Sequence, residues 1–467
     1  MAARIYGVRL LYLPSGRRRL SIALAVIAVL DYIKEAVVDI AAIDHRPLQF
    51  DFGQFQRAAQ DLGDGRNPYD AFVSMHCPGW CLGGYIYTPL LAEGLRPLAH
   101  LPLPRAATAW LLLTHLMVLA TALILWRALR GLTSPTALAT MLAAGLLFQP
   151  LFENLSYVQI GTLLLLVLTG AAALHLRGGS ARNRWAGALV GLATVIKVTP
   201  LLVTPALLPV GWAARGGSAA RAREAVAGVA GVLMAAALLV GVMLLFVPHT
   251  ADFFTQVLPH IGGGTTAYEN KSFPALIGRI SEWIGFLQPR LSPGPPDSKL
   301  VTLAGLLLFI GPVAWLAARR VPPQDQDRPA RAAAFAGYIA AMPIVSTITW
   351  RHHVVVSILA MALLLPALWP VAGPPASRAA RWLLVASYPL SYLPQDVLHQ
   401  LALGPGGSVD PTLISAFRVL LLEDLNLFGM ICLWMACALA LRGLLVTQRV
   451  RTGAVPALPG RVAVGST

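Results

Sequence analysis

Long apolar runs restrict the fold of this chain more than any other feature. An α-helix needs roughly 20 apolar residues to cross the ~30 Å hydrocarbon layer of a bilayer. Only 12% of the 467 residues are charged, against roughly 25% in soluble domains. This predicts an all-α polytopic membrane protein and excludes a soluble enzyme, a disordered chain and a coiled coil. Ten apolar runs of about this length are present, near 20–43, 104–126, 135–152, 157–176, 224–247, 299–318, 332–348, 353–370, 382–398 and 413–441.

An eleventh apolar stretch, about 186–210, is flanked by basic loops on both sides. Arginines cluster at 177–184 before it and at 215–223 after it. Because Lys and Arg collect on the cytoplasmic side, a single crossing would place one cluster outside. We therefore expect a hairpin of two short helices that meet near residues 197–200, where Pro200 interrupts the helix. Counting the hairpin as two passes predicts a bundle of about 12 transmembrane helices with both termini in the cytoplasm.

The net charge of +15 comes from 36 Lys and Arg residues against 21 Asp and Glu residues. In a soluble protein this excess would suggest nucleic acid as a partner. Here most of the basic residues fall in loops that the topology places inside, together with the tail 452–467. We therefore interpret the charge as an orientation signal in the plasma membrane and expect no nucleic-acid partner. Residues 1–467 are expected to form a single membrane domain.

Two long segments, 44–103 and 248–298, face the outer side in this topology, and we expect function there. Apolar residues between Phe52 and Leu62 recur at helical spacing, which predicts an amphipathic helix on the bilayer surface. Asp51 directly precedes that helix. Its carboxylate either caps the helix N-terminus or takes part in catalysis.

Four cysteines occur in the chain. Cys77 and Cys81 lie in the first outer segment, where an oxidising environment permits a small disulfide loop. Free thiols, or a metal site that includes His76, are the alternatives. Cys432 and Cys437 lie in the last apolar run, where packing is the expected role.

Several cations lie in or beside apolar runs on the outer side. A lysine inside an apolar stretch is costly and by default marks function, so Lys197 is expected to meet an anion such as a lipid phosphate; snorkelling near a helix end is the alternative. Arg351, His352 and His353 at the mouth of another span are also suited to a phosphate. Neighbouring histidines on a helix point about 100° apart, so we do not expect both on one metal ion.

Other polar residues allow more than one interpretation. The second outer segment carries Asn270, Lys271 and Arg279. Gln159 could hydrogen-bond a sugar or cap a helix. Acidic residues at 31, 35 and 39 recur on one face of the first span, which suggests a polar seam between helices.

A series of short motifs follows one order along residues 50–355. They are Asp51-Phe52-Gly53-Gln54-Phe55, Gly65-Arg66-Asn67-Pro68-Tyr69-Asp70, Tyr85-Ile86-Tyr87-Thr88-Pro89-Leu90, Val158-Gln159-Ile160, Lys197-Val198-Thr199-Pro200-Leu201, Asn270-Lys271-Ser272 with Arg279, and Ser346 to His353. In this order they resemble glycosyltransferase family 87. Two positions depart from that pattern: Gly161 stands where the family has Asn, and Lys271 where it has Gln.

The resemblance implies a GT-C-like fold and an inverting transfer of a sugar from a polyprenyl-phosphate donor, as in mycobacterial mannosyl- and arabinofuranosyltransferases. It implies that Asp51 is the base, that 44–103 is the catalytic loop and that 248–298 binds substrate. No metal or other cofactor is expected. The residues expected to bind the donor phosphate are Lys197, Arg351, His352, His353, Lys271 and Arg279. Those expected to bind the sugar or the acceptor are Gln159, Asn270, Tyr69 and Tyr87.

The substrate stays open at this point. Mannose is the first expectation for the sugar, with arabinofuranose as the alternative, and an envelope glycolipid or glycan is expected as acceptor. A transporter or flippase for a lipid-linked sugar is a second hypothesis, although transporters often contain two related halves and no internal repeat is evident. A structural subunit of an envelope complex is a third.

Overall fold

The structure is a computed structural model that describes residues 15–45, 52–74, 84–214, 218–261, 264–287, 298–319, 324–371, 375–403 and 412–446. Asp51, Cys77, Cys81 and the tail 452–467 lie outside the described residues, so the expectations for them stay predictions. In the described part, all regular secondary structure is helical apart from an isolated β-bridge between Thr133 and Pro370. The prediction of an all-α chain is confirmed.

The helices of the first half are α1 (Ser15–Ala41), η3 (Ile43–His45), α2 (Phe52–Gly63), α3 (Asp70–Ser74), α4 (Pro89–Leu95), η5 (Arg96–Leu98), α5 (Leu103–Leu129), α6 (Pro135–Leu146), α7 (Gln149–Ser156), α8 (Gly161–Leu176), α9 (Ser180–Ile196), η6 (Thr199–Leu207) and α10 (Ala219–Phe246). Those of the second half are α11 (Thr250–Asp252), η7 (Phe253–Val257), α12 (Leu258–Ile261), α13 (Phe273–Leu287), α14 (Ser298–Gly305), η9 (Leu306–Ile310), α15 (Gly311–Arg319), η10 (Gln324–Gln326), α16 (Asp327–Val345), η11 (Arg351–Val356), α17 (Ser357–Leu368), α18 (Arg378–Tyr392), α19 (Gln395–Leu403), α20 (Leu413–Glu423) and α21 (Leu425–Val446).

Several helices are long and apolar enough to cross a membrane. Within the described residues there are five, in α5, α10, the α14–α15 segment, the η11–α17 segment and α21. A sixth is possible if α6 and α7, bent by 40° at their junction, form one span. The protein is therefore a polytopic membrane protein, while the larger count of 12 passes remains a proposal.

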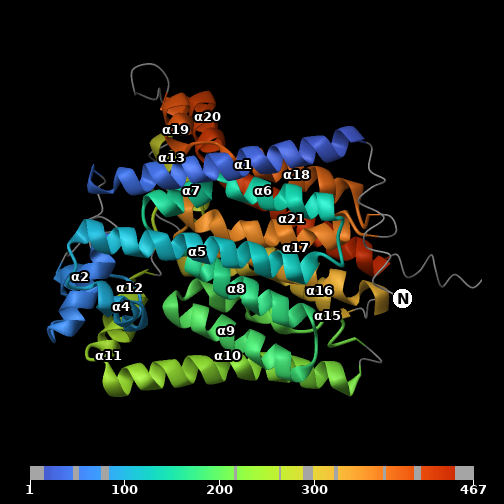
Figure 1. The fold of residues 1–467 in the computed structure, drawn as a ribbon. Helices are drawn as coiled ribbons and strands as arrows, with labels where there is room; N and C mark the ends of the chain where they lie inside the picture. Colours follow the sequence, from blue (N-terminus) through green and yellow to red (C-terminus); the bar gives the residue numbers. More distant parts are fainter. Residues whose placement is uncertain are drawn as a thin grey trace, which may run out of the picture.

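The long helices run side by side, with α1 along one edge of the view and α10 along the opposite edge (Figure 1). Helices α2, α4, α11 and α12 gather at one end of this bundle, and α19 and α20 lie close together beyond α1. The centre is formed by α16 and α17, whose residues are almost all buried. Segments of the two predicted outer regions therefore meet at one end of the bundle.

The predicted hairpin is present. Helix α9 ends at Ile196, Lys197 is extended, and the chain continues as the 3-10 helix η6. The side-chain amide of Asn183, near the start of α9, donates to the carbonyl of Leu207 at the end of η6 over 2.8 Å. The chain therefore returns to the end from which it entered, with Lys197 at the turn.

Glycines allow α9 and α10 to pack closely. A Cβ atom added to Gly187 would lie 2.0 Å from the carbonyl oxygen of Gly228, and one on Gly231 would lie 2.1 Å from that of Arg184. Small residues at helix interfaces let membrane helices approach to backbone contact. Helix α10 therefore packs directly against α9, the first arm of the hairpin.

Helix α2 has the predicted amphipathic pattern. Phe52, Phe55 and Leu62 are buried, together with Ala58 and Ala59. The apolar face contacts α4, η5 and α5, so it packs against protein rather than lying on the bilayer as expected.

The polar seam predicted along α1 is only partly present. Asp39 is buried and accepts a hydrogen bond from Ser156 over 3.3 Å. Asp31 and Glu35 instead pair with the exposed Lys34 on the same helix, at 3.5 and 2.8 Å. The spacing brings these acids to neighbouring turns, but only Asp39 lies against another helix.

Candidate active site

A cavity of about 760 Å³ lies between α2, α7, the α9–η6 turn, η7, the segment 345–353 and α19. One part of its wall is apolar and includes Leu201, Leu202, Leu258 and Leu306. The remainder carries charged and aromatic side chains. Of the residues predicted from the sequence, the following line it: Tyr87, Gln159, Lys197, Arg351, His352 and His353.

Lys197 reaches the cavity because the chain is extended at this residue, between two helices. Its Nζ lies 2.8 Å from Nε2 of His353 and 5.6 Å from the ring centre of Tyr87. Within the described ranges no carboxylate pairs with Lys197. Among the described residues, Lys197 is therefore a basic side chain of the cavity wall without a carboxylate partner.

Arg351, the other cation of the wall, is paired. Its Nη1 lies 2.6 Å from Oε1 of Glu153, and its Nη2 donates to the carbonyl of Tyr392 over 2.6 Å. Sequence reasoning did not select Glu153. The signal was available, because an acid inside the apolar region of α6–α8 is costly unless it has a function or a partner.

The two histidines diverge, as expected for neighbours in a helical turn. Their ring centres are 4.5 Å apart and their planes differ by 83°. His353 contacts Lys197, while the ring of His352 lies 5.8 Å from that of Tyr157. The described residues contain no group of three His, Cys, Asp or Glu side chains that could hold a metal ion.

Gln159 is presented to the cavity by a strained turn between α7 and α8. Val158 has a left-handed backbone with φ of 52°, which is rare and costly for a β-branched residue. The side chain of Asn154 supports the turn, since its Oδ1 accepts from the backbone N–H of Thr162 over 3.3 Å. This hydrogen bond helps to offset the backbone strain at Val158, the residue directly before the cavity residue Gln159.

Comparison with known proteins identifies the family. The model of Glycosyltransferase family 87 matches residues 85–347, which is more than half of the chain. The chain belongs to this family. It is therefore a membrane glycosyltransferase. A relative from Mycobacterium tuberculosis, the polyprenol-phosphate-mannose-dependent alpha-(1-2)-phosphatidylinositol mannoside mannosyltransferase, is 25% identical over 327 residues, which cover 66% of this chain and 68% of the relative.

Gly161 departs from the family motif for a steric reason. A Cβ atom at this position would lie 2.3 Å from Nδ2 of Asn154 and 2.8 Å from a methyl group of Val355. The amide of Asn154 also donates to the carbonyl of His352 over 3.4 Å. In this member of the family, the side chain of Asn154 occupies the space beside residue 161 and connects α7 to the histidine segment.

We expect Gly161→Ala to destabilise the protein by about 1–3 kcal/mol, because overpacking a filled site forces its neighbours to shift. The melting temperature of the purified protein in detergent measures this. Gly241→Ala is the matched control, since nothing lies within 4 Å of a Cβ there. The double variant with Asn154→Ala should lose less than the sum of the two single changes; strict additivity would contradict the steric explanation.

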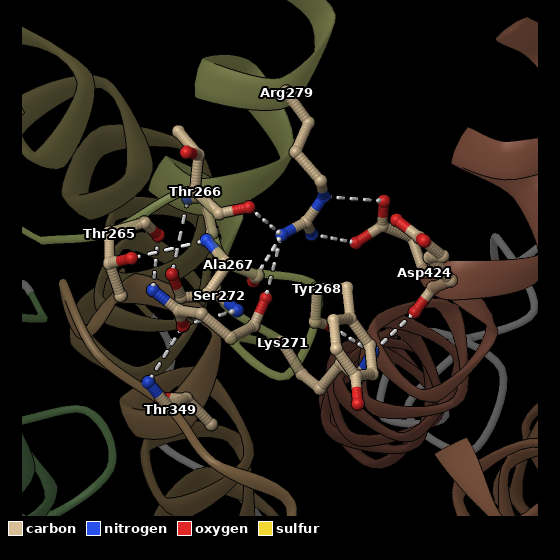
Figure 2. Close-up of polar contacts among 12 residues, drawn as sticks. Thr265, Thr266, Ala267, Tyr268, Lys271, Ser272, Arg279, Thr349 and Asp424 are labelled. Carbon is tan, nitrogen blue, oxygen red and sulfur yellow. Dashed lines mark hydrogen bonds and ion pairs between the residues drawn. The ribbon is translucent and has the colours of Figure 1, made fainter. Parts of the chain in front are cut away.

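The structure does not bring Lys271, Arg279, Asn270 or Tyr69 into the cavity wall. Figure 2 shows Lys271 and Arg279 directed toward Asp424 and its neighbours. Arg279 forms an ion pair with Asp424 and donates to the carbonyl of Ala267 over 3.0 Å. Both cations are therefore satisfied by the protein itself.

The same network fixes the loop 264–272. Lys271 donates to the carbonyl of Tyr268 and, over 2.7 Å, to that of Glu423, and burial lowers the pKa of Lys271 to about 8. Asn270 donates to the carbonyl of Thr347 over 2.9 Å and accepts from the N–H of Thr349 over 2.8 Å. This joins the loop to the segment that carries the cavity residues 345–353.

Tyr69 does not line the cavity but contacts the backbone of a residue that does. It is buried, and its hydroxyl donates to the carbonyl of Tyr87 over 2.9 Å. Its ring stacks on that of Tyr85 at 5.8 Å. The structure thus separates Tyr87, which lines the cavity, from Tyr69, which contacts its backbone.

Asp424→Asn is expected to destabilise the protein by roughly 3–5 kcal/mol, because it leaves the buried Arg279 without a counter-charge. Thermal unfolding in detergent checks this. Glu93→Gln is the control, since it removes an acid from a partly exposed pair with Arg96, and such pairs contribute little. If both substitutions lowered the melting temperature equally, the buried pair of Arg279 and Asp424 would stabilise the protein no more than the partly exposed pair does.

Proposed function

We propose that the protein is an inverting glycosyltransferase that transfers a hexose, mannose in the first place, from a polyprenyl-phosphate donor to an envelope glycolipid or glycan. The observation that carries the proposal is Lys197, a cation without a carboxylate partner in the described chain, in the wall of a cavity that is apolar on one side. A lysine in an apolar setting marks a functional site by default, and an anion is a partner that stabilises its charge. The phosphate of a lipid carrier supplies that anion and brings its own apolar tail.

The donor fits the two parts of the wall. Its phosphate would lie against Lys197 and the histidine pair, with Arg351 nearby. The isoprenoid would extend along Leu201, Leu202 and their apolar neighbours, toward the bilayer. This arrangement explains why a transferase site is built at the end of a transmembrane bundle.

The reaction needs one base and one stabilised leaving group. The acceptor hydroxyl attacks C1 of the sugar, its proton passes to a carboxylate, and the bond between C1 and the phosphate oxygen breaks. The leaving polyprenyl phosphate gains negative charge, which Lys197 stabilises. Asp51 is the proposed base: it directly precedes α2, whose first turn contributes Gln54 and Phe55 to the cavity. In this mechanism no metal is required.

We propose mannose because the mycobacterial relative is a polyprenol-phosphate-mannose-dependent mannosyltransferase, and arabinofuranose is the alternative. The proposal also includes a GT-C-like bundle of about 12 passes with cytoplasmic termini and a site at the outer face of the plasma membrane. In it, 44–103 acts as the catalytic loop and 248–298 as the substrate loop. The segment 248–298 also has a structural role, because Lys271 and Arg279 form contacts that fix the loop 264–272 and do not line the cavity.

The test uses purified protein in lipid nanodiscs with polyprenyl-phosphate-mannose, -glucose and -arabinofuranose in turn. We expect release of free polyprenyl phosphate when an acceptor glycan is added, and a product with anomeric configuration opposite to that of the donor. A flippase moves the donor without releasing polyprenyl phosphate. Movement without release would therefore support the transporter hypothesis and contradict the proposal.

A further inference from the structure

The charged side chains of the cavity form two groups. Lys197 is accompanied by the two histidines. Three carboxylates, those of Glu153, Glu269 and Asp396, also line the cavity and come from α7, the loop 264–272 and α19. These three lie far apart in the sequence, so the fold, not a local motif, brings them to one cavity.

The three carboxylates interact with Arg351 or Tyr268, and none of them interacts with Lys197 in the described residues. Arg351 pairs with Glu153 and also interacts electrostatically with Asp396. The hydroxyl of Tyr268 interacts with both Glu269 and Asp396. Burial, and to a smaller extent these two carboxylates, raise the pKa of Tyr268 to about 12. Arg351 and Tyr268 thus connect the three acids into one group, which we call the acidic wall, and within the described residues none of these acids pairs with Lys197.

This wall is held rigidly. The ring of Tyr268 stacks on that of His399 with 3.9 Å between centres, and Nδ1 of His399 lies 2.7 Å from a carboxylate oxygen of Glu423. The residues that follow Glu269 are fixed by the network of Figure 2. Side chains that are held in place before binding form a more selective site.

The wall also has an unsatisfied donor. The side chain of Arg351 is 97% buried (3% exposed), and its Nε has no hydrogen-bond partner in the described part of the chain. Buried N–H groups are almost always paired. The rings of Trp350 and Tyr157 line the same cavity and offer flat apolar faces. Carboxylate acceptors and aromatic rings match the hydroxyls and the C–H face of a sugar.

We propose that Glu269 and Asp396 form the acceptor subsite and bind the neutral, hydroxyl-rich sugar end of the acceptor. Sugar hydroxyls donate to the two carboxylates. The two carboxylates repel an anion placed beside them, so any anionic group of the acceptor lies away from Glu269 and Asp396, as does the donor phosphate at Lys197. This inference rests on the proposed function, and Asp396 lies beyond the segment that the family model matches.

The test compares Glu269→Gln, Asp396→Asn and the double variant with the wild type, using polyprenyl-phosphate-mannose as donor and a neutral alkyl mannoside as acceptor. We expect each single change to raise the KM for the acceptor about 10-fold, since hydrogen bonds to charged groups contribute on this scale, with a much smaller change in the KM for the donor. Glu282→Gln is the matched control, because Glu282 is exposed on α13 and is not among the lining residues.

A second arm tests charge selection. The wild type should use the alkyl mannoside far better than its 6-phosphate, and the double variant should discriminate less. Unchanged acceptor KM in both single variants, or an equal rise in the donor KM, would overturn the inference.

Direct binding keeps the inference separate from the proposed function. Saturation-transfer NMR with the alkyl mannoside, without donor, should show binding to the wild type and to Glu282→Gln and weaker binding to the double variant. If no donor is ever turned over but this pattern holds, the proposed function fails and the sugar subsite stands. If donor turns over and the pattern is absent, the subsite fails alone. Melting temperatures near that of the wild type show that the variants are folded.

Discussion

Replacing Lys197 with methionine is expected to reduce kcat/KM for sugar transfer by about 100-fold or more, because removing one preorganised donor to a developing anion costs this much in other enzymes. Lys197 stands at the turn of the α9–η6 hairpin with His353 as its contact at 2.8 Å and no carboxylate partner in the described ranges. Methionine keeps the length of the side chain and removes the charge. Steady-state release of polyprenyl phosphate measures the effect.

Two further variants separate charge from structure. Lys197→Arg retains the charge and should recover part of the activity. Lys34→Met removes a lysine of α1 whose side chain is 65% exposed and which is not among the residues that line the cavity, and it should leave activity unchanged. Wild-type turnover in Lys197→Met would contradict the assignment of the donor phosphate to this part of the wall.

Asp51→Asn is expected to reduce the rate of transfer by about 10²–10⁴-fold, the loss that removal of a general base causes. Asparagine is isosteric and does not accept the proton of the acceptor hydroxyl. The KM for the donor should change little, because the proposed base does not contact the phosphate. Single-turnover measurements with saturating donor and acceptor report the chemical step directly.

Asp64→Asn is the matched control for Asp51. Asp64 follows α2 on the same outer segment and is 43% exposed in a pair with Arg66. Both variants should insert and melt like the wild type. If Asp51→Asn turns over normally while folded, another carboxylate of the cavity, with Glu153 the first to test, must accept the proton.

Much of the fold could be predicted from local sequence patterns. Apolar runs predicted an all-α membrane chain, helical spacing predicted the buried face of α2, and basic loops on both sides of 186–210 predicted the hairpin with Lys197 at its turn. These features depend on short segments and on the energetic cost of charge in a bilayer. Both can be evaluated without knowing the tertiary contacts.

Other expectations could not be decided in this way. Lys271 and Arg279 carry positive charge in an outer segment, which is what a phosphate site requires. Whether they meet a ligand or the protein depends on Asp424, 145 residues from Arg279 in the sequence. The sequence around Arg279 does not indicate that Asp424 is its partner.

The sequence by itself determined that the chain is an α-helical membrane protein, where its helix is interrupted, and that it resembles glycosyltransferase family 87. Only the tertiary structure decided which cations have a counter-charge within the described residues, since it paired Arg351 with Glu153 and Arg279 with Asp424 but placed Lys197 beside His353. It also brought Glu269 and Asp396 to one cavity. The physical reason is that helix formation and burial in the bilayer depend on local composition, whereas the charge balance of a site depends on groups that only the packed fold places together.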